Sequence, residues 1–225
     1  MARKILGVLG GMGPAATLEF LAQLQARTPA IRDQDHLRVL VDINPQVPDR
    51  NDPEAEPGPV LMEMAKGLRA AGAEVLAIAC NTAHRYADQV ARGSGLPVID
   101  MIAQAAAEVR MRGAHSAGVL GTPGAAALYQ ERLADQGVRY IPLDHDNQAA
   151  FMRLLYLIKS GDTGEEVVAG VRALVKSLEA DGAQAIIAGC TEVPLVLRQS
   201  DMDTVLIDAG ELLALRCIAA CLSDQ

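Results

Sequence analysis

The sequence predicts an α/β protein made of two similar α/β domains, each with a parallel-type sheet and flanking helices. Short apolar runs alternate with longer stretches of helical periodicity, which is the pattern of a parallel sheet with crossover helices. The 225-residue chain also has no Trp and only two Phe. Ala, Val, Ile and Leu must therefore form its core, a composition that suits close packing of helices on a parallel sheet.

The apolar runs place the expected elements in chain order. We expect strands at residues 4–10, 37–43, 75–79 and 98–99 in the first half, and at 117–121, 138–142, 185–188 and 205–207 in the second. Helices fill most of the intervals. One helix is expected over residues 163–180, capped by Thr163, with acidic residues in its first turn. The proline-rich stretch 44–59 predicts a long loop.

The chain repeats itself at an offset close to half its length. Residues 7–10 recur at 118–121, 71–73 at 181–183, 79–80 at 189–190 and 98–100 at 206–208. Four matches in the same order predict two domains, residues 1–113 and 114–225, although the last helix could pack back on the first domain. Two like domains related by a pseudo-twofold axis would leave a cleft between them, which is a usual place for a ligand.

Composition and charge exclude several classes of protein. The formal net charge is −8, and the sequence contains no run of basic residues. The chain therefore lacks the phosphate-neutralising face that nucleic acid requires. No apolar stretch is long enough to span a membrane. We expect a cytoplasmic protein whose four cysteines serve chemistry or packing rather than disulfides.

Two cysteines occupy equivalent places in the repeat. Cys80 and Cys190 each follow an apolar strand and precede polar residues that we expect to open a helix, where a thiolate would be favoured. A single cysteine in this position is usually a packed core residue. Two of them suit inversion of a carbon centre, because one base removes a proton from one face and a second acid delivers a proton to the other. A hydrolase would need an unlike nucleophile, base and orienting group.

Three short segments then carry a specific resemblance. They are Gly10-Gly11-Met12-Gly13-Pro14, Cys80-Asn81-Thr82-Ala83-His84 and Gly189-Cys190-Thr191-Glu192. In this order and spacing they resemble the signature segments of the aspartate/glutamate racemase family, on its aspartate racemase branch, and the likeness includes residues 44–50. The resemblance implies racemisation of a small acidic amino acid by a cysteine pair, with no pyridoxal phosphate, no other cofactor and no metal. It also implies a homodimer.

The remaining site residues are assigned around the two thiols. Asn81, Thr82, Thr191 and Thr122 suit the α-carboxylate of the substrate, although ordinary helix capping would explain them equally well. Met12 and Gly13 are expected to line the cleft. Arg50 and Lys159 are candidates for the second carboxylate, in line with the resemblance, and the planar fork of Arg50 makes it the better one. We expect His84 and Glu192 to support the thiols rather than transfer protons.

Other readings stay open at this point. Cys217 and Cys221 lie one helical turn apart and are expected to be core residues. A decarboxylase or isomerase that uses a single cysteine, a non-catalytic protein that binds a dicarboxylate, and a dithiol redox protein are the alternatives to a racemase. Glutamate is the second choice of substrate after aspartate.

Overall fold

The computed structural model describes residues 3–223 of the chain. Its contacts divide the chain into two compact units. The first comprises the described residues up to Met101 and from Gly210 onward, and the second comprises Ile102–Ala209. Each unit is an α/β body with its own parallel sheet, which confirms the expected fold class. The domain limits 1–113 and 114–225 remain a prediction.

The sheet of the first unit has the strand order β2-β1-β3. Its strands are β1 (Leu6–Gly10), β2 (Val39–Ile43) and β3 (Val75–Ile78), all parallel. The strand expected at residues 98–99 is reduced to a single bridge between Val98 and Leu76. This expectation was wrong because Pro97 offers no N–H to extend the ladder and α4 already begins at Met101.

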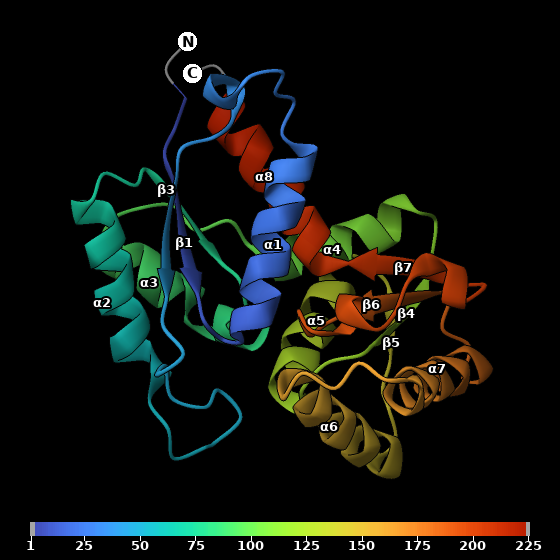
Figure 1. Cartoon of the computed structure of the whole chain (residues 1–225). Helices are drawn as coiled ribbons and strands as arrows, with labels where there is room; N and C mark the ends of the chain where they lie inside the picture. The colour runs from blue at the N-terminus through green and yellow to red at the C-terminus, as the bar shows by residue number, and fades with distance from the viewer. Residues whose placement is uncertain (1–2, 224–225) are drawn as a thin grey trace. The chain divides into compact units, whose positions relative to one another are not determined.

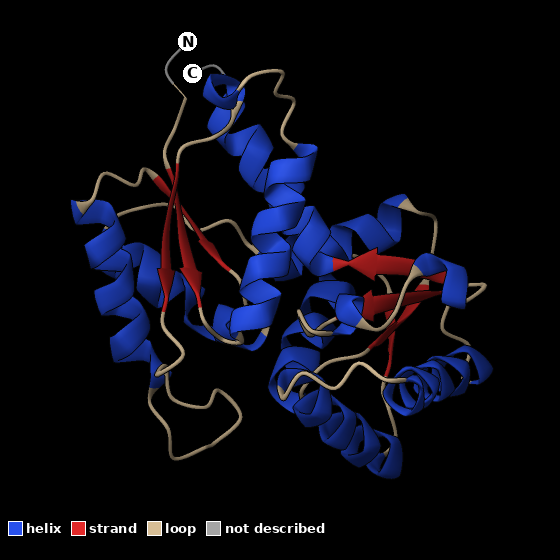
Figure 2. Ribbon diagram, in the orientation of Figure 1, coloured by secondary structure: helices blue, strands red, loops and turns tan. Residues whose placement is uncertain are grey.

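The sheet of the second unit has the strand order β5-β4-β6-β7. Its strands are β4 (Ser116–Val119), β5 (Arg139–Ile141), β6 (Ala185–Ala188) and β7 (Val205–Asp208), again all parallel. Within each sheet the arrowheads of Figure 2 point the same way. The first three strands of the two sheets are connected in the same order, and the bridge at Val98 corresponds to β7. The internal repeat of the sequence is thus a repeat of topology.

The helices of the first unit cover both faces of its sheet. Helices α2 (Pro57–Ala70) and α3 (Ala87–Ser94) lie on one face, and α1 (Pro14–Arg27) lies on the other (Figure 1). The final helix, α8 (Ala209–Leu222), also packs here. The backbone N–H of Lys4 donates to the carbonyl of Cys221 at 3.1 Å, and Arg27 pairs with Glu211 at 2.5 Å.

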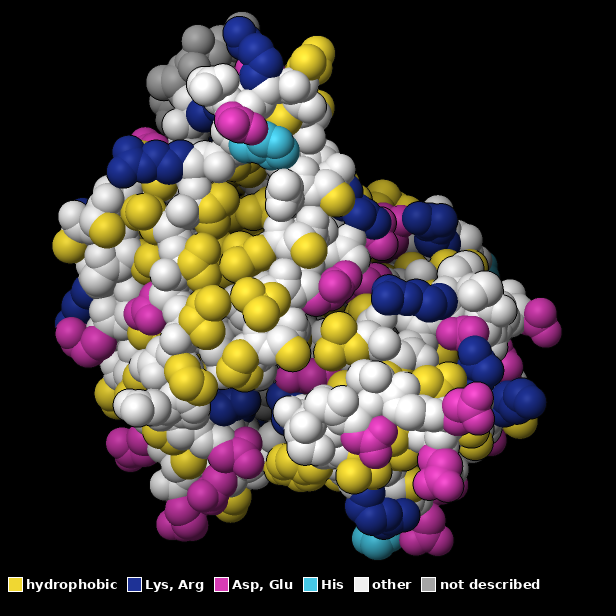
Figure 3. Space-filling view, viewed as in Figure 1, with side chains coloured by type: hydrophobic (Ala, Val, Ile, Leu, Met, Phe, Trp, Pro, Cys, Tyr) yellow, Lys and Arg dark blue, Asp and Glu magenta, His cyan; other side chains and the backbone are white. Residues whose placement is uncertain are grey.

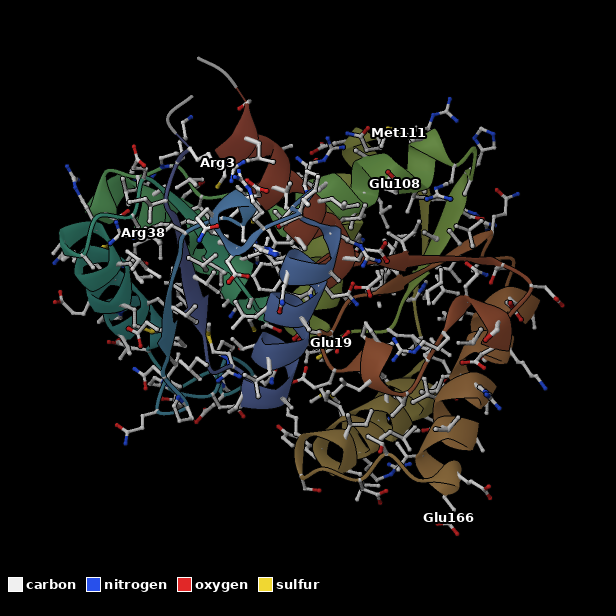
Figure 4. All side chains as sticks on the ribbon, turned by 45° about the horizontal axis from the view of Figure 1, so that its top comes forward. Arg3, Glu19, Arg38, Glu108, Met111 and Glu166 are labelled. Atoms are coloured by element: carbon white, nitrogen blue, oxygen red, sulfur yellow. The ribbon has the colours of Figure 1, made fainter. Side chains whose placement is uncertain are left out.

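The helices of the second unit are α4 (Met101–Met111), α5 (Pro123–Asp135), α6 (His145–Lys159) and α7 (Glu165–Ala180). Helices α6 and α7 lie side by side in Figure 1. The cap expected at Thr163 was wrong, because the carboxylate of Asp162 accepts a hydrogen bond from the N–H of Gly164 and makes Gly164 the N-cap. Glu166 projects from the first turn of α7 into solvent, near the positive end of the helix dipole (Figure 4).

Each sheet is buried between its helices, with one exposed apolar area on the first unit. Strands β1 and β3 are fully buried, whereas Val41 and Ile43 on the edge strand β2 are exposed, as is Leu18 on α1. Hydrophobic side chains gather on this side of the first unit in Figure 3. Between residues 3 and 223, no helix is both long and apolar enough to cross a membrane.

Candidate active site

Both cysteines lie at the switch point of a parallel sheet. In the first unit the chain leaves β1 to form β2 on one side and β3 on the other, and Cys80 stands two residues after the end of β3. In the second unit β4 is followed by β5 on one side and β6 on the other, and Cys190 stands two residues after β6. Ligands of open α/β sheets bind in the crevice that forms at such a point. The two thiols are therefore equivalent in topology.

Cys80 is held by backbone contacts and apolar packing. Its side chain is buried among Leu9, Met12 and Val47 in the core of the first unit. The N–H of Cys80 donates to the carbonyl of Ile78 at 2.8 Å. Among the described residues, none makes a hydrogen bond to the Cys80 sulfur. The thiol side of this half-site is apolar.

His84 anchors the segment that follows Cys80. Its Nδ1 lies 2.8 Å from the carbonyl oxygen of Cys80, and its Nε2 accepts a hydrogen bond from the N–H of Met101 at 3.2 Å. These two partners require the neutral tautomer that carries its proton on Nδ1. Burial lowers the pKa of His84, and its hydrogen bond with the Cys80 carbonyl only partly opposes that shift. His84 thus supports the cysteine through its backbone.

The helical segments that follow the two cysteines are short. Cys80 is followed by a 3₁₀ helix, Thr82–Tyr86, and the α-helix α3 begins only at Ala87. Cys190 is followed by a 3₁₀ turn, Val193–Leu195. The expected helix after Cys80 is thus a 3₁₀ helix, and the one after Cys190 is a single 3₁₀ turn. Short segments of this kind align few peptide dipoles, so they favour a thiolate less than an α-helix N-terminus would.

The glycine turn after β1 is fixed by a residue that the sequence analysis missed. The hydroxyl of Thr17, fully buried, accepts from the N–H of Gly11 and donates to the carbonyl of Gly13, both at 2.9 Å. Gly11 has φ +93°, and a Cβ there would stand 2.4 Å from the backbone of Asn44. The available signal was a threonine four residues into a helix that follows a glycine run. Tertiary contact with Asn44 could not be seen in the sequence.

Arg50 folds back onto the same turn. Its Nη1 donates to the carbonyls of Val47 and Pro48, at 3.3 and 3.1 Å, and its Nη2 donates to the carbonyl of Met12 at 3.2 Å. Its Nε is buried and has no hydrogen-bond partner within the described chain. The side chain of Met12 is a core residue, only 2% exposed, so Met12 contributes its backbone rather than its side chain to this half-site.

Cys190 stands in a charged setting. Its Sγ donates to Oε2 of Glu192 at 3.0 Å, and the hydroxyl of Thr191 donates to the same oxygen at 3.3 Å. The other oxygen of Glu192 accepts a hydrogen bond from the ammonium group of Lys159, at the end of α6. Glu192 is 2% exposed. A lysine, a glutamate and a thiol are thus linked in a row inside the second unit.

The other expected site residues lie on segments that follow the strands of one unit or the other. Asn81 and Thr82 are buried immediately after Cys80, and Gly13 is the N-cap of α1. Thr122 is buried as the N-cap of α5 and accepts from the N–H of Ala125 at 3.2 Å. A Cβ on Gly121 would lie 3.0 Å from the carbonyl oxygen of Gly189, so the turn with Thr122 adjoins the segment between β6 and Cys190.

Cys217 and Cys221 lie apart from both half-sites, on α8. Both are buried. Burial raises the pKa of the Cys221 thiol to about 11, and it also raises the pKa of Cys217. They act as core residues. Over residues 3–223, no group of three or more His, Cys, Asp or Glu side chains stands ready to hold a metal ion.

Comparisons with known proteins agree with this architecture. The model of the Asp/Glu/Hydantoin racemase family matches residues 9–217. The solved structure of the aspartate racemase of Picrophilus torridus superimposes with a TM-score of 0.87 at 27% identity, covering 97% of this chain and 94% of that one. The protein is therefore an isomerase by class, and the chain belongs to the Asp/Glu/Hydantoin racemase family.

Two relatives show the range within that family. The broad specificity amino-acid racemase RacX of Bacillus subtilis (strain 168) is 28% identical over 98% of this chain and the whole of its own length. A glutamate racemase of Synechococcus sp. (strain CC9605) is 28% identical over 88% of this chain and 71% of its own. Both relatives are amino-acid racemases by name, and they differ in their substrates.

Proposed function

We propose that this protein interconverts L- and D-aspartate, with glutamate as the second choice, by proton transfer between two cysteines and without a cofactor. The observation that carries the proposal is the equivalence of Cys80 and Cys190, each at the switch point of its own sheet. A reaction that exchanges the two faces of a carbon centre is the chemistry that needs the same group twice.

The reaction balances with the two thiols alone. A thiolate takes the α-proton from one face of the substrate: the C–H bond breaks, an S–H bond forms, and the electron pair stays on the substrate carbanion. The second thiol then gives its proton to the other face, so that its S–H bond breaks and a new C–H bond forms. The roles reverse for the other enantiomer. Such a general acid and base pair contributes about 10² to 10⁴-fold for each group.

Arg50 is the group that we assign to the second carboxylate of the substrate. Its guanidinium is already oriented by three backbone carbonyls, and its buried Nε–H has no acceptor within residues 3–223. An oriented guanidinium with a spare donor suits a carboxylate. Lys159, the other candidate, is paired with Glu192, so we give it a smaller part in substrate recognition.

The α-carboxylate is assigned to the polar residues that follow each thiol. Asn81 and Thr82 are buried next to Cys80, and Thr191 is buried next to Cys190. To these we add Thr122, whose neighbour Gly121 approaches Gly189, and the backbone of Met12 and Gly13, where the Met12 carbonyl binds Arg50. Each of these residues also has a structural role, and we propose that the two roles coexist.

The decisive experiment uses L-aspartate in deuterated water with no added cofactor. We expect loss of optical rotation together with α-deuterium incorporation. Cys80→Ala and Cys190→Ala should each abolish both signals. Cys221→Ala removes a buried thiol outside either half-site and should leave both unchanged. Turnover that survives in either single variant would exclude the two-base mechanism and favour a single-cysteine decarboxylase or isomerase. Binding of aspartate without any exchange would indicate a non-catalytic binding protein.

A second comparison tests the choice of an acidic substrate. The wild type should racemise aspartate faster than asparagine, which has the same shape and lacks the charge. Arg50→Gln should lower kcat/KM for aspartate by about 10 to 100-fold, the value of one or two charge-assisted hydrogen bonds, and should change asparagine turnover much less. Equal turnover of both substrates by the wild type would instead indicate a broad specificity racemase, as its relative in Bacillus subtilis is named.

The homodimer and the cytoplasmic location remain proposals that rest on the family resemblance and the composition. Sedimentation velocity of the purified protein checks the first, and fractionation of the source cells checks the second.

A further inference from the structure

The two thiols have equivalent places in the fold but unlike neighbours. Cys80 and Cys190 are equally buried, at 6% and 7% exposed. Within the described part of the chain, no side chain makes a hydrogen bond to the sulfur of Cys80. The sulfur of Cys190 lies 3.0 Å from a carboxylate oxygen of Glu192. The two cysteines have the same place in the sheet topology and nearly the same exposed fraction. They differ in that a carboxylate lies beside the sulfur of Cys190.

The contact between Cys190 and Glu192 contains one hydrogen, and that hydrogen belongs to the thiol. A glutamate that is paired with an ammonium group is ionised, and an ionised carboxylate can only accept hydrogen bonds. The thiol must therefore be the donor. If Cys190 were a thiolate, two negative charges would face each other at 3.0 Å inside the protein. Like charges at such a distance disfavour the ionised form of one partner.

Lys159 determines the net charge of the row formed by Lys159, Glu192 and Cys190. Its ammonium group binds one oxygen of Glu192, and the thiol binds the other. With Cys190 protonated, the lysine and the glutamate cancel and the row is neutral. With Cys190 ionised, the row carries one net negative charge beside a glutamate that is 2% exposed. A buried row of groups is most stable when it is neutral.

We propose that Glu192, held by Lys159, is a positioning residue that keeps Cys190 protonated in the resting enzyme, so that Cys80 is the thiol that begins the reaction as the base. This proposal deepens the proposed function, on which it rests. The resting form is then ready for the enantiomer whose α-hydrogen faces Cys80. After one turnover Cys80 holds the proton and Cys190 is a thiolate. Exchange with water removes the proton from Cys80 and returns one to Cys190 before the same enantiomer can react again.

Alkylation of the substrate-free protein tests the resting state directly. The thiolate is the species that attacks iodoacetamide. The protein is treated at pH 7.5 for increasing times, and each cysteine peptide is quantified by mass spectrometry. We expect Cys80 to be labelled at least about tenfold faster than Cys190, because the carboxylate of Glu192 beside Cys190 disfavours its thiolate. Cys217 and Cys221 should stay unlabelled and report that the fold is intact.

Two variants with opposite expected signs separate an electrostatic role from a structural one. Glu192→Gln removes the negative charge and should speed labelling of Cys190 by about tenfold. Lys159→Gln leaves Glu192 without its cation and should make the labelling of Cys190 slower than in the wild type. A purely structural role would loosen the site in both variants and shift the rate in one direction. The matched control is Glu179→Gln, because Glu179 is also a carboxylate with a hydrogen bond of its own, from Thr204, and should leave Cys190 unchanged.

The outcomes are distinct. Labelling of Cys190 as fast as Cys80 in the wild type overturns the proposal, and so do equal signs for Glu192→Gln and Lys159→Gln. If Glu192→Gln fails to fold, which labelling of Cys217 reveals, the slower labelling in Lys159→Gln decides alone. Because the test uses no substrate, it is independent of turnover. If the protein shows the expected labelling but racemises no substrate, the proposed function is wrong, while the difference between the two thiols still holds.

Discussion

The half-site around Cys80 and the half-site around Cys190 share a topology and differ in what holds them. The first is built on backbone groups: Thr17 ties the glycine turn, Arg50 binds three carbonyls, and His84 binds the carbonyl of Cys80. The second is built on a charged row in which Lys159, Glu192 and Cys190 touch through their side chains. The comparison teaches that a repeated fold fixes where a thiol stands, while non-repeated side chains decide its chemical setting.

The largest effect on stability should come from the glycine turn of the first half-site. Gly11→Ala places a Cβ 2.4 Å from the backbone of Asn44 at φ +93°. We expect it to lower the free energy of unfolding by about 3 kcal/mol, combining backbone strain and overpacking. Gly72→Ala is the matched control in the same unit: it has φ +104° but its Cβ would meet only the Ile5 side chain at 4.0 Å, and should cost about 1 kcal/mol.

Urea unfolding followed by circular dichroism measures both glycine variants, since the chain has no Trp for fluorescence. Equal losses in the two variants would show that the turn is not tightly packed against Asn44. In the second unit the position that corresponds to Gly11 is Thr122, which has an ordinary extended backbone with φ −64°. The backbone strain thus belongs to one half-site only.

The charged row of the second half-site should give the next largest effect. A double-mutant cycle on Lys159→Met and Glu192→Gln should yield a coupling energy of about 2 kcal/mol, because removing one partner leaves the other charge buried. The matched pair is Lys66 and Glu63 on the surface of the first unit, where we expect no more than about 0.5 kcal/mol. Equal coupling in the two cycles would mean that the buried row adds no more than a surface ion pair.

The smallest expected effect is on the dependence of stability on pH, through His84. Burial lowers the pKa of His84 below its ordinary 6.5. The unfolded chain therefore binds a proton at a higher pH than the folded chain does. The stabilising contribution of neutral His84 is complete above pH 6.5 and is lost as the pH falls toward the folded pKa, by at most about 1.4 kcal/mol for each pH unit.

His84→Asn should accordingly reduce the loss of stability between pH 7.5 and pH 5.5, measured as urea unfolding at each pH. His145→Asn is the control, because the His145 side chain is 97% exposed. An unchanged acid dependence in His84→Asn would place the acid sensitivity of the protein elsewhere. A smaller dependence would locate it in the first half-site.

Much of the fold could be predicted from local pattern. The strand at residues 185–188 agrees with β6, and the other predicted strands differ from the observed ones mainly at their ends. Apolar runs of this kind are visible because burial on both faces selects the same residue types along a whole strand. The errors arise where neighbouring residues compete for one role: Gly164 rather than Thr163 caps α7, and Val98 forms only a bridge.

The partners of the site residues could not be predicted in the same way. No feature of the sequence sets Thr17 apart from other helix residues, and Lys159 was expected to bind the second carboxylate of the substrate. Lys159 and Glu192 lie 33 residues apart in the chain and meet because α6 and β6 share one hydrophobic core. Met12 turned its side chain into the core. No periodicity encodes such contacts.

By itself, the sequence determined the α/β class, the internal repeat and the two thiols that end equivalent strands, since each follows from a periodicity or a spacing along one chain. Tertiary structure alone decided that Cys80 rests among apolar groups and backbone contacts while Cys190 faces a carboxylate that an ammonium group holds in place. The physical reason is that electrostatic surroundings depend on distances between separate elements, which packing sets and local pattern does not contain.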